Sequence, residues 1–155
     1  MADHGLAPDE ICAAVGRGEE ADVATVRQWL DTGGDANAKC PGTLGTPWES
    51  VLQRAARRGN TEILSLLLSR GADINHTDNW GRTALYILLN HFGERGGSLS
   101  ALMLLLSNGA DVNLTWSQSY SGSLAGKSPL MHACSRGPDV VRLLLRAGAD
   151  AEHRA

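Results

Sequence analysis

The chain has 155 residues, enough for one domain with a sizeable core, and its 14 basic and 17 acidic side chains give a net charge of −3. That balance argues against general affinity for nucleic acid, whose binders carry a strongly basic face. No apolar run is long enough to span a membrane, and the N-terminus lacks the pattern of a secretory signal. Because Cys12, Cys40 and Cys134 share no short spacing, we expect reduced thiols in an intracellular protein, cytoplasmic or alternatively nuclear, rather than a disulfide framework.

Four segments of similar sequence recur along the chain: "TGGDANA" at 32–38, "RGADINH" at 70–76, "NGADVNL" at 108–114 and "AGADAEH" at 147–153. Their aspartates are separated by 38, 38 and 39 residues, and a leucine-rich run precedes each of the last three. A period of this size predicts a solenoid in which each repeat is one supersecondary unit. A single domain over 1–155 would then hold repeats at about 7–39, 40–77, 78–115 and 116–155.

Each repeat reads as two helices and an extended turn, most clearly in the second repeat. We expect its first helix to begin near Thr46, which has capping-box spacing to Glu49, and to end at Gly59. A second helix from Thr61 to Gly71 is too apolar for an isolated surface helix, so it must pack on more than one side. The Asp-, Asn- and Gly-rich segment that follows predicts an extended turn.

The four tryptophans divide into two predicted classes. Trp29 takes the place of the leucine run and Trp48 stands in the expected first helix, so both are predicted to be packed in the core. Trp80 and Trp116 lie in turns, where an exposed tryptophan is more often a contact residue than a core residue. The turns are therefore the first place to look for a binding surface.

One segment resembles a phosphate-binding loop, because Gly126, Lys127 and Ser128 match the end of that motif. Ser121 stands where the motif needs its first glycine, and the alternative is a repeat turn in which Ser128 and Pro129 start a helix. The histidines are scattered and no G-x-S-x-G elbow is present. The sequence therefore predicts no catalytic, cofactor-binding or metal-binding residue.

Taken together, these motifs resemble the ankyrin repeat family, whose pattern combines a G-x-T-P-L-H opening, an Ala-Ala pair, a glycine between helices, L-L-L and G-A-D-V-N. In this chain, residues 81–85 correspond to the opening, Ala55-Ala56 to the alanine pair, Gly59 to the glycine between helices and 109–113 to G-A-D-V-N. The match spans roughly residues 9–153. The resemblance implies an all-α solenoid of four helix-turn-helix repeats joined by extended β-turn or hairpin fingers.

The chain also departs from the family pattern. The family's histidine is replaced by Glu49, Tyr86 and Met131, and the period exceeds the usual ~33 residues. We place the extra residues of the second repeat inside its first helix, as about one additional turn after Thr46.

The resemblance implies a non-enzymatic module that binds a protein partner through a concave groove of fingers and first helices. The alternative is a regulatory or inhibitory subunit of an enzyme, or the ankyrin part of a larger catalytic protein. Basic or histidine-containing pairs recur at the ends of the first helices, so we expect a partner with an acidic patch, and no nucleic acid, membrane or cofactor. The predicted partner-binding residues are Lys39, Thr43, Leu44, Arg57, Arg58, Thr77, Asn79, Trp80, Arg82, Asn90, His91, Arg95, Thr115, Trp116, Tyr120, Lys127 and Arg136.

Asn75 and Asn113 occupy equivalent places in successive turns, where asparagine usually holds the turn by bonding to backbone groups. The alternative that the resemblance implies for animal members is hydroxylation, since Leu67 and Leu105 lie eight residues earlier.

The two ends of the predicted stack differ in polarity. The N-terminal repeat has a polar outer face, as terminal repeats need for solubility, whereas the last helix, "DVVRLLLRAGAD", has the apolar density of an internal repeat. We therefore expect the C-terminal face to pair with another molecule, itself included, or to be covered by sequence beyond this chain.

Overall fold

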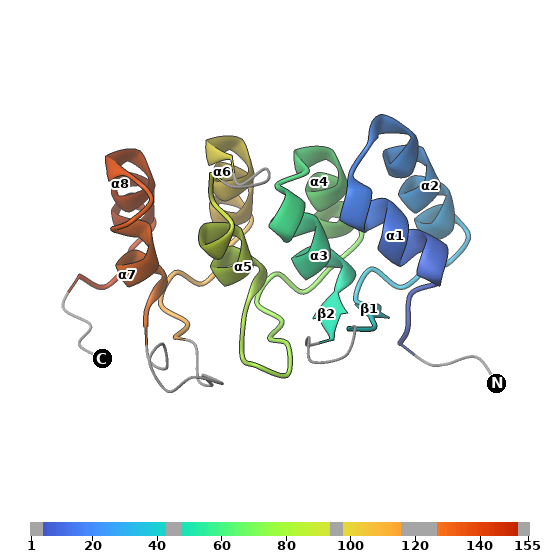
Figure 1. Cartoon of the computed structure of the whole chain (residues 1–155), viewed down its shortest axis with the longest axis horizontal. Helices are drawn as coiled ribbons and strands as arrows, with labels where there is room; N and C mark the ends of the chain where they lie inside the picture. Colours follow the sequence, from blue (N-terminus) through green and yellow to red (C-terminus); the bar gives the residue numbers. More distant parts are fainter. Residues whose placement is uncertain (1–4, 43–47, 94–97, 116–126, 152–155) are drawn as a thin grey trace.

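Four consecutive pairs of helices stand side by side along the long axis of the molecule (Figure 1). The computed structural model describes residues 5–42, 48–93, 98–115 and 127–151. Within these ranges the pairs are α1 (Asp9–Arg17) with α2 (Glu20–Asp31), α3 (Val51–Arg58) with α4 (Thr61–Ser69), α5 (Ala84–Asn90) with α6 (Leu99–Ser107), and α7 (Pro129–Ala133) with α8 (Pro138–Arg146). The predicted helical solenoid of the ankyrin type is confirmed.

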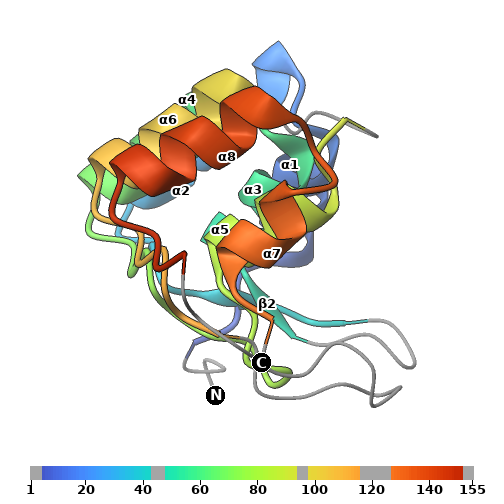
Figure 2. The same cartoon turned by 90° about the vertical axis from the view of Figure 1, so that its left-hand side faces the viewer.

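The helices form two layers (Figure 2). We call α1, α3, α5 and α7 the inner layer and α2, α4, α6 and α8 the outer layer, and each helix packs against its counterpart in the next repeat. Leu64 and Leu67 of α4 are completely buried, as are Leu102 and Leu105 of α6. A single repeat could not cover these side chains, so the core is continuous along the stack.

The segments that join one repeat to the next, which we call fingers, leave the helices along one common edge (Figure 2). The first finger contains a hairpin of β1 (Lys39–Cys40) and β2 (Glu49–Ser50), paired antiparallel with Lys39 opposite Ser50. In the second finger the Asp78 carboxylate accepts hydrogen bonds from the backbone N–H groups of Trp80 and Arg82, both at 2.9 Å. The fingers are thus closed by local hydrogen bonds.

The predicted start of α3 was wrong by four residues. Ser50, not Thr46, is the N-cap: its hydroxyl accepts from the Gln53 N–H at 3.2 Å, and Gln53 Oε1 accepts from the Ser50 N–H at 2.8 Å. Gln53 Nε2 also donates to the carbonyl of His76 at 3.1 Å, which ties the helix to the next finger. The extra residues of this repeat therefore precede α3, and Thr46 lies outside the described residues.

The prediction that all three cysteines are reduced was also wrong. Cys12 of α1 and Cys40 of β1 form a disulfide with a Cα–Cα distance of 5.6 Å, and Cys134 is free and exposed. The two bonded residues are 28 positions apart, so only the fold brings them together. The disulfide joins the first helix to the first finger.

A ladder of asparagine side chains links successive fingers. The Asn75 amide donates to the carbonyl of Gly109 at 3.4 Å and accepts from the N–H of Asp111 at 2.8 Å. Asn37 makes the same pair of bonds to the second finger, and Asn113 makes them to the C-terminal turn. The predicted bonding of these asparagines to backbone is confirmed, with the partner groups in the following repeat.

Trp29 packs against the core, as predicted, and its position is matched by a glycine. Trp29 is equivalent to the completely buried Leu67, and Gly34 is equivalent to Ala72. A Cβ added at Gly34 would lie 2.4–2.6 Å from atoms of the Trp29 indole, closer than packed atoms can approach. The larger ring and the smaller neighbour therefore compensate each other in the first repeat.

Replacing Asn75 with alanine is expected to lower the free energy of unfolding by about 1–2 kcal/mol, because it removes two hydrogen bonds between fingers. Asn79→Ala is the matched control, since Asn79 is exposed in the same finger. Urea unfolding followed by circular dichroism measures both variants. Equal stability of the two variants would contradict this account of the ladder.

Gly34→Ala is expected to destabilise the protein by about 1–3 kcal/mol through overpacking against Trp29. In the double variant Trp29→Leu/Gly34→Ala, which has the pair found in the second repeat, the loss should be at least about 1 kcal/mol smaller than the sum of the two single losses. Thermal and urea unfolding of all four proteins gives the coupling energy. Strictly additive losses would show that the two positions do not compensate.

Candidate functional site

A cluster of four charged side chains, of which Arg57 is half-buried and the other three are buried, lies where the second repeat meets the second finger. Arg82 donates to Asp78 at 2.7 Å through Nε and to Glu49 at 3.3 Å through Nη2. Arg57, at the end of α3, also pairs with Glu49. Two carboxylates and two guanidinium groups balance each other here, so the cluster holds the finger bases in place and offers little net charge to a partner.

Trp80 is positioned by this cluster. Its ring lies over the Arg82 guanidinium, 4.7 Å from the ring centroid, and the side chain is half-buried. Because Arg82 is itself held by two carboxylates, the indole has a fixed support. The finger edge thus presents a preorganised aromatic side chain.

Trp48 is a second aromatic group on this edge, and its predicted place in the core was wrong. It directly precedes Glu49 of the cluster, and 42% of its surface is exposed. Alignment of Ser50 with the helix caps Thr83 and Ser128 would have moved Trp48 out of α3 and into the finger. That alignment is the sequence signal that could have identified it as a surface residue.

Three of the arginines predicted to meet a partner are engaged within the protein. Arg82 is buried, Arg57 pairs with Glu49, and Arg136 donates to the carbonyls of Asn90 at 2.7 Å and Phe92 at 3.4 Å. The bond to Asn90 satisfies a carbonyl group at the end of α5, which has no partner within the helix, and Phe92 lies two residues beyond that end. The expected basic stripe is therefore largely used to stabilise the fold.

The remaining predicted residues fall into three groups. Those on the exposed finger surface are Lys39, Thr77 and Asn79. Half-buried positions are taken by Arg58, Asn90, His91, Thr115 and Lys127. Outside the described residues lie Thr43, Leu44, Arg95, Trp116 and Tyr120.

His132 of α7 is partly buried between the inner-layer helices. Its ring meets Tyr86 edge-to-face with centroids 4.8 Å apart, and its Nε2 has no hydrogen-bond partner among the described residues. Burial, together with the positive charges of Lys127 and Arg136, lowers the pKa of His132 below its ordinary value. Burial likewise raises the pKa of Tyr86.

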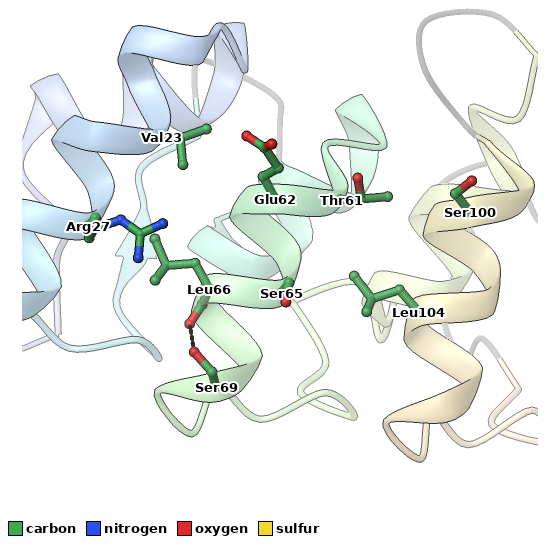
Figure 3. A pocket seen from close by; sticks show the side chains of 9 residues that line it. All are labelled: Val23, Arg27, Thr61, Glu62, Ser65, Leu66, Ser69, Ser100 and Leu104. Atoms are coloured by element: carbon green, nitrogen blue, oxygen red, sulfur yellow. Dashed lines mark hydrogen bonds between the residues drawn. The ribbon is translucent and has the colours of Figure 1, made fainter.

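The outer layer has a groove of about 600 Å³ across α2, α4 and α6 (Figure 3). Arg27 lines it from α2 and Glu62 from the central helix α4, and the rest of the lining is mostly serine and leucine side chains (Figure 3). Ser69 Oγ donates to the carbonyl of Leu66 at 2.7 Å, so this hydroxyl serves the helix end. Neither histidine nor cysteine is among the residues that line the groove, and the carboxylate among them, Glu62, is exposed to solvent.

No group of three His, Cys, Asp or Glu side chains in the part of the chain that the structure describes could hold a metal ion, and none of the described helices could cross a membrane. The segment resembling a phosphate loop leads into α7, where Ser128 is the N-cap and Pro129 the first helical residue, as the repeat alignment predicted.

Comparisons with known proteins agree with the observed architecture. A sequence model of the family described as "Ankyrin repeats (3 copies)" matches residues 11–115 and 52–155. The chain is 41% identical over 69 residues to 2-5A-dependent ribonuclease of Mus musculus and 38% identical over 80 residues to ankyrin repeat and SAM domain-containing protein 6 of Danio rerio. These alignments cover 44% and 52% of this chain but only 9% and 10% of the relatives.

The environment of His132 predicts a loss of stability in acid. Since its pKa is depressed in the folded state, the unfolded chain binds the proton more readily once the pH falls below about 6.5. Stability should therefore decline from pH 7.5 toward pH 5, and His132→Phe, which keeps an aromatic ring beside Tyr86, should show a smaller decline. Urea midpoints at several pH values measure the difference. Parallel pH profiles for the two proteins would contradict the assignment.

Proposed function

The chain belongs to the ankyrin repeat family, and from this premise we propose that it is a non-enzymatic module that binds a protein partner through its fingers and inner-layer helices. Ankyrin repeats are generally protein–protein interaction modules. The observation that carries the proposal is the position of Trp80, half-exposed on the finger edge and held by the Arg82 cluster.

Preorganisation supports this surface as the binding site. Ordering a flexible side chain on binding costs about 0.5–1.5 kcal/mol, and a ring that is already fixed avoids most of that cost. Trp48 extends the apolar surface next to the same cluster, and Leu114 in the third finger is also exposed. Aromatic anchors on a rigid frame are the usual source of most binding energy in an interface.

The chemistry of these residues indicates the kind of partner. Apolar side chains of the partner would fill the space beside Trp48 and Trp80. Arg58 and Lys39 make no ion pair with a described residue, so they remain available to attract carboxylates on the partner. Charges at the rim of an interface act mainly on the association rate, so we assign the acidic patch of the partner to steering.

A second candidate is a regulatory or inhibitory role toward an enzyme, either as a subunit or as part of a longer catalytic chain. It is favoured by the similarity to a protein named as a ribonuclease, of which this chain matches 9%. The two candidates differ in outcome, because a regulatory module changes the turnover of its partner whereas a scaffold changes only the partner's location.

The proposed surface is tested with a partner captured from native lysate, identified by mass spectrometry and measured by calorimetry. Trp80→Ala and Trp48→Ala should each weaken binding at least about tenfold, because truncating an aromatic anchor removes ~2 kcal/mol or more. Met103→Ala is the control, since Met103 is 56% exposed on α6 in the outer layer. Arg58→Glu should chiefly slow association and reduce its dependence on salt.

Melting temperatures separate loss of binding from loss of folding, because Trp80 also contacts Arg82. If both tryptophan variants fold and bind as the wild type does while Met103→Ala weakens binding, the outer layer is the binding surface. Adding the chain to an enzymatic partner and following its turnover distinguishes the regulatory role from scaffolding.

A further inference from the structure

The C-terminal end of the stack has an apolar groove of about 600 Å³ between α7 and α8. Val141 and Leu145 line it from α8 beside the charged Arg142, and Cys134 lines it from the end of α7. Leu145 is 45% exposed and Cys134 is exposed, although both are apolar in character. Unlike a single exposed apolar residue, several that share one groove form a contiguous apolar surface of the kind that marks an interaction site.

Internal repeats show what normally covers these positions. Counted from the helix caps, Cys134 is equivalent to Ala56 and Leu89, both completely buried. Counted from the Gly-Ala-Asp segment, Val141 is equivalent to Leu64 and Leu102, also completely buried. In each case the next helix pair packs on this side of the repeat. The C-terminal face is therefore built to receive another pair of helices.

The opposite end of the stack does not have such a face. None of the exposed large apolar residues in the described part of the chain lies on α1 or α2. The outward-facing side chains there include Glu10, Arg17 and Glu20. A head-to-tail stack of copies would place the apolar groove against this polar end, whereas a tail-to-tail pair places apolar surface against apolar surface.

We propose that the C-terminal face is a self-association surface, on which a second copy of this chain packs tail-to-tail with its α8 antiparallel to the first. Such an interface is symmetric, so it closes at two copies and buries Val141 and Leu145 of both. The second copy supplies the helix pair that each internal repeat obtains from its successor.

The charges of α8 suit this arrangement. Asp139 lies in the first turn of the helix, where it pairs with Arg142 at 3.2 Å, and Arg146 lies in the last turn; all three side chains are exposed. When two such helices run antiparallel, the carboxylate of one copy comes opposite the guanidinium of the other at both ends. The pattern is self-complementary, and it would place like charges together if the helices ran parallel.

The test is the molar mass of the chain, measured by sedimentation equilibrium from low to high micromolar concentration. We expect a reversible monomer–dimer equilibrium, and Leu145→Glu should weaken it at least about tenfold by placing a charge in the apolar interface. Met103→Glu is the matched control, because Met103 is similarly exposed on the outer layer. A monomer at all concentrations, or equal weakening by both variants, would overturn the proposal.

Charge exchange on α8 tests the orientation without altering the apolar face. Arg146→Glu should weaken the dimer, and Asp139→Arg in the same chain should restore it, because the two charges face each other across an antiparallel interface. Failure of the second change to restore the dimer would overturn the antiparallel arrangement. Circular dichroism establishes that each variant is folded.

Cys134 provides a second measurement. It is exposed in the groove, and the other two cysteines are joined in a disulfide, so a thiol reagent reports on this position. Its reaction with a maleimide should slow as the protein concentration rises and the groove becomes covered. A rate that does not change with concentration, in a protein that dimerises, would place the interface elsewhere.

Discussion

An isolated helix pair leaves one side of its leucine-rich helix in water, and this constraint makes every repeat depend on its neighbours. Leu64 and Leu102 are completely buried only because the following repeat lies against them. The asparagine ladder applies the same dependence to the fingers, since each amide satisfies backbone groups of the next repeat. Hydrophobic burial thus holds the helices together, while directional hydrogen bonds set how the fingers line up.

The finger edge illustrates how a module of this kind can use charges without exposing them. Glu49, Asp78 and Arg82 are buried and Arg57 is half-buried, and the four charges neutralise one another, which removes much of the positive charge from the expected groove. The same cluster holds Arg82 in place, and Arg82 gives the Trp80 ring a rigid support. The surface offered to a partner is consequently more aromatic and less basic than the list of its residues suggests.

The parts of the structure that depend on local sequence were predictable. The start of α4 at Thr61 and the cap of α7 at Ser128 follow from signals within a few residues, and the period follows from the recurrence of one short segment along the chain. The start of α3 was not predictable in this way, because two possible capping boxes lie four residues apart. The box that forms contains Gln53, whose side chain also bonds to the next finger. The pairing of Cys12 with Cys40 likewise depends on distant segments meeting in space.

The disulfide between Cys12 and Cys40 limits how far the first repeat can come apart. It ties α1 to the first finger, and such a link is worth typically about 2–4 kcal/mol because it restricts the opened chain. When α1 separates from the first finger, the segment between the two cysteines is a closed loop and not a free chain end. The first repeat therefore closes again from nearby, without the search that a free chain end would need.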